Sequence, residues 1–303
     1  MRKFYLENAN GDRIGLNGES GIRLGNPAGL GVRMENTYSE IGNGFLQLEH
    51  KKIKKEPFTC DLTFTRSAYS RYRQFVNWVA AAGTLYLIYK PFGDTEYYSR
   101  VELEYLTKDE LSRGKWLVVP CALKMLTPWY VAEPTELTIT TEDANEKRYG
   151  WDEEEQDYCY TYSDDLHYGS DADGLLSVRI APSGHAPAEL VLRCYGELVN
   201  PKIRLVGLTT GTVYGICSLS SEMDAAATFG PTDTLELSTR EEDSHVIKIA
   251  ADGTRTDLLE AVDPSQEIYF KAPTTETVEL TLESDAVFTG SASLQVYYYF
   301  WSV

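Results

Sequence analysis

The hydrophobic period changes within residues 67–130, and this change constrains the fold more than any other feature of the sequence. Ser67 can cap a helix that Gly83 can end. The apolar residues of this helix share one face, namely Ala68, Tyr72, Phe75, Val76 and Val79, with Arg71, Arg73, Gln74 and Asn77 opposite. Strand-like runs follow at residues 84–90, 101–105 and 115–126. The segment therefore predicts one helix, a hairpin and a closing strand.

The residues before this helix predict further strands. Asn10-Gly11 is a strong signal for a β-hairpin. The glycine-rich run at residues 21–31 lacks the order of a phosphate-binding loop, which favours a bent, bulged strand connection. Residues 58–64 alternate between apolar and polar side chains, as a half-buried strand does.

A cluster of lysines lies between the first strands and the helix. It consists of Lys51, Lys52, Lys54 and Lys55. Such a run can dock an acidic neighbour, or it can be a solvated strand edge that blocks unwanted strand pairing. With Arg71 and Arg73 from the polar face of the helix, these lysines are the candidate assembly contacts.

Charge divides the chain of 303 residues into two parts. Residues 1–132 hold 18 Lys and Arg against 14 Asp and Glu, whereas residues 133–303 hold 10 against 32. We therefore expect two domains, 1–132 and 133–303, which is within the usual size range. A second half with a net charge of −22 argues against nucleic-acid binding there, because phosphates repel it.

The second half predicts strands throughout. Short β-like runs separated by turns follow residue 175, and Asp252-Gly253 is a clear turn between two of them. We expect residues 190–195 to pair with residues 200–205. This pattern is typical of a β-sandwich, so the expected fold class is mainly β with one helix, α+β overall.

The sequence offers no signature of catalysis, metal binding or cofactor binding. Five cysteines form an odd number without a C-x-x-C pair, which favours free buried thiols. The four histidines are scattered, and residues 18–21 fall one residue short of G-x-S-x-G. Asp173-Gly174, in the acidic section 145–174, is only a fragment of a calcium loop. We expect no enzyme and no cofactor, although paired glycosidase carboxylates leave no local spacing and stay open.

No membrane span or signal peptide is expected either. No apolar run approaches the roughly 20 residues of a membrane helix, and the chain begins with polar residues. We therefore expect synthesis in a cytoplasm.

The order of motifs resembles a known family. The motifs L-Y-L-I-Y-K-P-F-G (85–93), W-L-V-V-P-C-A-L-K (116–124) and L-T-P-W-Y (126–130) resemble the N-terminal belt domain of siphophage distal tail proteins. In the second half, L-V-L-R-C-Y-G-E-L-V-N-P-K-I-R-L (190–205), the turn at residues 211–215 and Y-Y-Y-F-W (297–301) are similar to the C-terminal galectin-like sandwich of that family. The section 145–174 matches neither.

The resemblance implies a structural role in the virion. It implies a homo-oligomeric ring, a hexamer by family precedent, which links the tail tube to the tail-tip hub or host-adhesion apparatus. The implied partners are copies of the chain, the major tail tube protein, a tail-associated hub or lysin protein and a receptor-binding protein. The implied location is the tail tip, with assembly in the cytoplasm of the bacterial host.

A second hypothesis is a carbohydrate-binding module for host cell-wall glycans. Aromatic rings stack on sugars, and the tyrosines of the second half that could do so are Tyr158, Tyr160, Tyr162, Tyr168, Tyr297 and Tyr299. The same tyrosines could instead fill half-buried strand positions. Both interpretations stay open at this stage.

Overall fold

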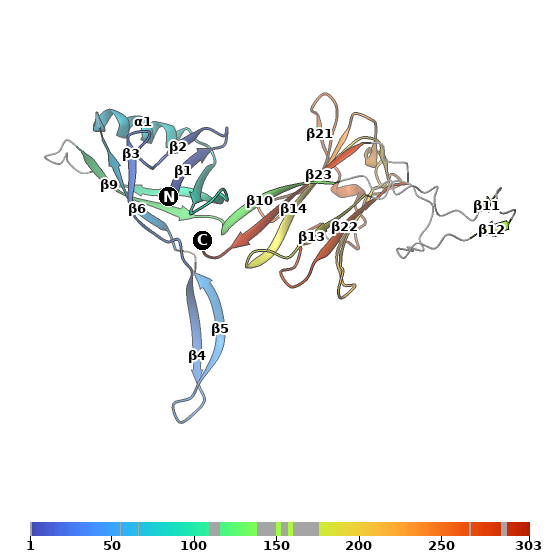
Figure 1. Ribbon diagram of the computed structural model, residues 1–303, viewed down its shortest axis with the longest axis horizontal. Helices are drawn as coiled ribbons and strands as arrows, with labels where there is room; N and C mark the ends of the chain where they lie inside the picture. Colours follow the sequence, from blue (N-terminus) through green and yellow to red (C-terminus); the bar gives the residue numbers. More distant parts are fainter. Residues whose placement is uncertain are drawn as a thin grey trace. The chain divides into compact units, whose positions relative to one another are not determined.

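The computed structural model describes residues 2–54, 56–65, 67–108, 116–137, 150–152, 157–159, 176–266, 268–285 and 290–303. Strands make up most of this described chain, and α1 (Ala68–Ala80) is its single α-helix (Figure 1). The expected fold class, mainly β with one helix, is confirmed.

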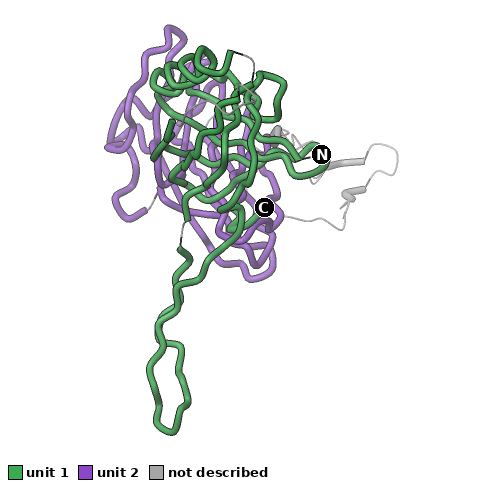
Figure 2. Tube along the Cα trace, turned by 90° about the vertical axis from the view of Figure 1, so that its left-hand side faces the viewer, with its two compact units in different colours: residues 1–131, 299–303 green, residues 132–298 purple. Residues whose placement is uncertain are grey.

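The chain divides into two compact units. Unit 1 comprises Met1–Val131 and Tyr299–Val303, and unit 2 comprises Ala132–Tyr298 (Figure 2). The sequence-based division assigned everything after residue 132 to the second domain, whereas the structure returns the last five residues to unit 1.

Unit 1 is built from antiparallel strands. They are β1 (Lys3–Asn8), β2 (Arg13–Gly15), β3 (Ile22–Ala28), β4 (Arg33–Glu40), β5 (Leu46–Lys54), β6 (Phe58–Phe64), β7 (Leu85–Lys90), β8 (Tyr97–Leu106), β9 (Leu117–Met125) and the start of β10 (Trp129–Leu137). Pairing runs β2-β1-β7-β8-β9-β6-β3, while β4 and β5 pair only with each other among the described strands. The expected hairpin at Asn10-Gly11 joins β1 to β2, and a register shift between Gly25 and Ala28 confirms the bulged strand expected at 21–31.

The helix is held to the sheet by aromatic side chains. Phe75 is buried and its ring lies 5.7 Å from that of Phe64 on β6, in an edge-on arrangement. Tyr72, one turn earlier, meets the same ring at 5.7 Å. Strand β6 alternates strictly between buried and half-buried residues, as its sequence predicts. The apolar helical face therefore packs where the period-3.6 pattern indicated.

Both expected boundaries of the helix need correction. Ser67 occupies the N-cap position, but its backbone is left-handed (φ 55°) and its side chain makes no capping hydrogen bond. The helix ends at Ala80, and Gly83, with φ 65°, lies beyond the C-cap residue Ala81. A side-chain contact ties the helix down instead, because Arg71 Nη1 donates to the backbone carbonyl of Ser20.

The C-terminal residues complete unit 1. The ring of Phe300 lies 5.4 Å from that of Tyr97, and the ring of Tyr299 lies 6.0 Å from that of Tyr130. The backbone N–H of Val303 donates to the carbonyl of Leu30 at 3.4 Å. The end of the chain therefore packs against residues of the first half, which sequence spacing gives no means of predicting.

Unit 2 contains two antiparallel sheets. Its strands include β13 (Leu176–Ile180), β14 (Ala186–Tyr195), β16 (Lys202–Gly207), β17 (Val213–Ser218), β19 (Thr234–Arg240), β20 (Asp243–Ile249), β21 (Arg255–Asp257), β22 (Val278–Glu283) and β23 (Ser291–Phe300). One sheet has the order β23-β14-β19-β20-β21 and the other β13-β22-β16-β17. Short elements complete the described part: β11 (Gly150–Asp152), β12 (Asp157–Cys159), β15 (Leu198–Val199), β18 (Thr228–Phe229) and the 3-10 helices Ala225–Ala227 and Leu259–Ala261.

The expected pairing of residues 190–195 with residues 200–205 is wrong. Strand β14 pairs with β19, and β16 pairs with β17 and β22. The connection between β14 and β16 turns at Gly196 (φ 131°) and Asn200 (φ 48°), which carries the chain from one sheet to the other. Strands that are adjacent in sequence therefore lie in different sheets.

Packing explains why glycine ends the turn motif at residues 211–215. The ring of Phe270 lies directly over Gly215, where a β carbon would have no room. Beside it, the Tyr214 hydroxyl donates to Glu276, which also accepts the backbone N–H groups of Thr209 and Thr210 at 3.1 Å. Hydrogen bonds from Tyr214 and Thr210 hold the pKa of Glu276 below its ordinary value. The carboxylate thus fixes the loop between β16 and β17.

The packing of α1 gives a first prediction. Replacing Phe75 by Ala should lower the free energy of unfolding of unit 1 by about 3–5 kcal/mol, since it leaves a cavity against Phe64. Gln74→Ala changes the exposed neighbour and should stay within about 0.5 kcal/mol of wild type. Chemical denaturation of both variants checks this, and equal effects would show that the helix is not anchored by its aromatic face.

Arg71 and Arg73 give a second prediction. Arg71→Ala removes a charged donor from the Ser20 carbonyl and should destabilise unit 1 by about 1 kcal/mol, whereas Arg73→Ala removes an exposed side chain and should be neutral. Thermal unfolding of the two variants shows which of the two arginines stabilises unit 1. A larger loss for Arg73→Ala would contradict this assignment.

Candidate assembly surfaces

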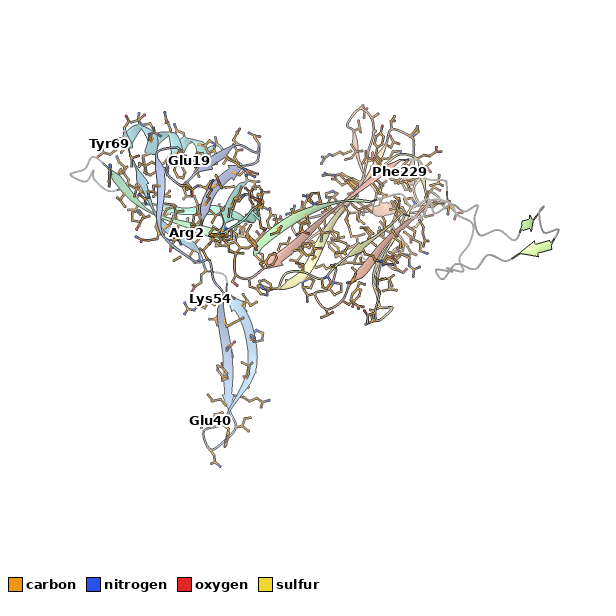
Figure 3. The ribbon with its side chains drawn as sticks, in the orientation of Figure 1. Arg2, Glu19, Glu40, Lys54, Tyr69 and Phe229 are labelled. Atoms are coloured by element: carbon orange, nitrogen blue, oxygen red, sulfur yellow. The ribbon has the colours of Figure 1, made fainter. Side chains whose placement is uncertain are left out.

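Strands β4 and β5 form a hairpin that projects from the rest of unit 1 (Figures 1 and 2). We call residues 33–54 the arm, with Lys54 at its root and Glu40 near its tip (Figure 3). The two strands pair from Arg33 with Lys54 to Glu40 with Leu46, and they form a sheet of their own. An isolated two-stranded hairpin is marginally stable in water, so the arm lacks the support that a larger sheet provides.

The arm has one apolar face. Alternate residues of a strand point to the same side, and the cross-strand pairs Met34 with Ile53 and Tyr38 with Leu48 lie on one side. The register shifts between Thr37 and Tyr38, which leaves Glu49 as an extra residue in β5. The apolar residues of this face are Met34, Tyr38, Leu46, Leu48 and Ile53.

The bulge is what unites this face. Leu46 and Leu48 are even-numbered and Ile53 is odd-numbered, so a regular strand would place them on opposite sides. The extra residue Glu49 reverses the alternation between them. The single bulge therefore places the apolar side chains on one side of the arm, where Asn36 and Lys51 separate Met34 and Ile53 from Tyr38 and Leu48.

The apolar face is open to solvent in the described chain. Leu46 is 66% exposed, Tyr38 is 52% exposed, and Phe45 at the tip is 72% exposed. Large exposed apolar residues grouped on one element mark an interaction surface, since a soluble protein rarely exposes such a patch without a partner.

The opposite face of the arm is polar. Its pairs are Arg33 with Lys54, Glu35 with Lys52, Thr37 with His50 and Ser39 with Gln47. The Lys54 ammonium lies 3.9 Å from the Glu35 carboxylate, and Arg33 pairs with Glu56 at 2.7 Å. These exposed ion pairs contribute little stability, so they do not by themselves hold the arm.

The structure places the candidate assembly contacts in two locations. Lys51, Lys52 and Lys54 lie on β5, with Lys51 opposite Asn36 on the same side as the apolar residues and Lys52 on the polar face. Neither Lys51 nor Lys52 is joined by an ion pair to another residue of the described chain. Lys55 lies outside the described residues, and Arg71 and Arg73 are on α1, where Arg71 contacts Ser20. The role of these six residues in assembly stays a prediction.

Sequence reasoning missed the arm as a separate hairpin. The signal was present, because Gly42-Asn43-Gly44 separates the two runs and all three residues have positive φ angles. The register shift at Glu49 interrupts the alternation of apolar and polar residues in β5. The sequence pattern therefore shows the lysine cluster but does not predict the apolar face.

Of the tyrosines named in the carbohydrate hypothesis, the structure describes the side chains of Tyr297 and Tyr299. Tyr297 and Tyr299 are buried at 9% and 8% exposure, and they fill strand positions of β23. Tyr160, Tyr162 and Tyr168 lie outside the described residues, as does the acidic section apart from β11 and β12. Nothing in the described exposure of these residues favours sugar stacking.

The described residues contain no cluster of three or more His, Cys, Asp or Glu side chains suited to a metal ion. The Ser20 hydroxyl, from the near-match to G-x-S-x-G, donates to the Gly15 carbonyl at 2.5 Å. The calcium-like Asp173-Gly174 lies outside the described residues. No helix within the described ranges has both the length and the apolar character of a membrane span.

Part of the chain matches the model of a known family. Residues 3–126 match the family model described as distal tail protein, N-terminal domain. That range includes β1 through β9, the helix and the whole arm. Among curated protein sequences, none matches the chain closely enough to count as a relative.

Solved structures share the fold over the full length. A chain of the phage P2 baseplate in its activated conformation with calcium is 15% identical, with a TM-score of 0.65 and complete coverage of both chains. The same baseplate with strontium gives the same values. The Dit protein of phage SPP1 is 11% identical, with a TM-score of 0.56, covering 97% of this chain and 98% of the other. Residues 3–126 therefore match the N-terminal domain of distal tail proteins, and the whole chain shares its fold with the phage P2 baseplate chain and the SPP1 Dit protein.

Proposed function

We propose that copies of this chain build a closed ring at the distal end of a phage tail, in which the apolar face of each arm is covered by the neighbouring copy. The observation that carries this proposal is the apolar side of the arm, on which Met34, Tyr38, Leu46 and Leu48 are exposed in the described chain and Ile53 is half-buried. Burial of apolar surface stabilises association in proportion to the area removed from water.

A neighbouring copy suits this surface because the contact repeats. When the arm of one copy lies on a different surface of the next, the contact is head-to-tail, and a rotation that closes gives a ring. The outer face of β8 and β9 is the receiving surface that we favour. It exposes Tyr105 and Val118, whose positions on the paired strands place them on the same side as Pro120.

The wider role follows from the family. We infer that the ring joins the major tail tube protein on one side to a hub or lysin protein on the other, and that a receptor-binding protein attaches at the tail tip. A hexamer and assembly in the host cytoplasm are the expectations that come with this inference. Support comes from the distal tail protein domain at residues 3–126 and from the shared fold with baseplate proteins.

The apolar face of the arm gives a third prediction. The wild-type protein should form a particle whose mass is a multiple of 34.1 kDa, measured by light scattering after size exclusion. Leu46→Asp with Leu48→Asp should shift it to the monomer, because charge on this face opposes burial. Thr37→Asp with Gln47→Asp adds the same charge to the polar face and should leave the particle intact.

Two results would overturn this account of the arm. The first is a wild-type protein that stays monomeric at high concentration even with its tail-tube and hub partners present. The second is a double leucine variant that assembles as well as its polar-face control.

The lysines give a fourth prediction that separates the two interpretations of their cluster. If Lys51 and Lys52 dock an acidic neighbour, Lys51→Glu with Lys52→Glu should weaken assembly by tenfold or more, and wild-type assembly should weaken as salt rises. Arg23→Glu, at an exposed position of β3 outside the candidate set, is the control for charge alone. If neither the lysine variant nor added salt changes the extent of assembly, the lysine cluster is a solvated strand edge.

A further inference from the structure

Two buried cysteines lie directly opposite each other in the core of unit 1. Cys60 on β6 and Cys121 on β9 are register partners, and they are 6% and 2% exposed. Both belong to the alternating set of buried residues on their strands, so both side chains enter the same core. The residues are 61 positions apart in sequence, and a spacing this long gives no hint of pairing.

The hydrogen bonding around Pro120 fixes the kind of strand pair. The carbonyl of Pro120 accepts the backbone N–H of Thr107, on the β8 side of β9. Successive residues of a strand direct their backbone groups to opposite sides, so Cys121 directs its own groups to β6. Cys60 and Cys121 are then a hydrogen-bonded antiparallel pair, whose Cα atoms lie about 5.5 Å apart. Disulfides span Cα separations of about 4.4–6.8 Å.

The two thiols already interact. A hydrogen bond with the Cys121 thiol, together with burial, raises the pKa of Cys60 far above its ordinary value. The attacking species in disulfide chemistry is the thiolate, so this pair reacts slowly near neutral pH and faster as pH rises. A reducing cytoplasm therefore leaves the pair as two thiols.

Two further buried cysteines, Cys194 and Cys217, do not face another thiol across their strand pairs. Cys194 lies opposite Leu235, and Cys217 lies opposite Ile203 in the other sheet of unit 2. Burial raises the pKa of each thiol to about 12. These residues are internal controls, since they are equally buried but lack a facing thiol.

We propose that Cys60 and Cys121 are a modification site, at which an intrachain disulfide forms once the protein has left the reducing cytoplasm. With a low-molecular-weight disulfide as oxidant, one Cys thiolate attacks the oxidant and releases one thiol. The second Cys then displaces the other half, so two protein thiols become one disulfide and the oxidant becomes two thiols. The timing rests on the proposed function, but the pairing rests only on the register of β6 and β9.

The test counts thiols in the intact wild-type protein. The folded protein is incubated with oxidised glutathione at pH 7 and pH 9, unfolded, alkylated and weighed by mass spectrometry. We expect two of the five thiols to be lost, faster at pH 9, with one peptide pair linked through residues 60 and 121 and restored by dithiothreitol. The melting temperature should rise with the disulfide, because the cross-link closes a long loop in the unfolded chain.

Variants assign the loss to the pair. Cys194→Ser should still lose two thiols, whereas Cys60→Ser and Cys60→Val should lose none. Retention of all five thiols by folded wild-type protein at pH 9, or linkage through other cysteines, would overturn the proposal. Light scattering of the reduced protein reports ring formation separately, so failure of the disulfide and failure of assembly are distinguishable.

Discussion

The apolar side of the arm is the constraint on which this structure depends. The rest of unit 1 buries its apolar residues in one core, where Phe58, Phe64 and Phe75 are almost fully enclosed. The arm has no such enclosure, because its two strands pair only with each other in the described chain. A two-stranded sheet with one exposed apolar face is only marginally stable in water. Burial of that face against another molecule would stabilise it. The exposed apolar side of the arm therefore supports the proposed assembly.

The remainder of unit 1 forms the packed base from which the arm projects. Strands β3 and β6, between which the arm is inserted, pair with each other and with β9, and the final residues of the chain bond back at Leu30. The helix is fixed by Phe75 and Arg71. The proposed ring requires that each copy repeat the same contact, and a well-packed base would support the arm in that role.

Local patterns in the sequence predicted much of this fold. The helix, the strict alternation of β6 and the predominantly β second half all depend on residues close in sequence, and they were found. The pairing of β14 with β19 and the return of residues 299–303 to unit 1 depend on distant contacts, and they were not. The arm lies between these cases, because one inserted residue, Glu49, breaks the period on which the prediction relies.

Amide hydrogen exchange of the arm tests the central claim most directly. Exchange of residues 33–54 would be compared between the assembled wild-type protein and the monomeric protein at high dilution. The account predicts that the arm amides exchange rapidly in the monomer and become strongly protected on assembly, since a covering surface closes them off from water. Assembled particles whose arm amides exchange as fast as those of the monomer would contradict it.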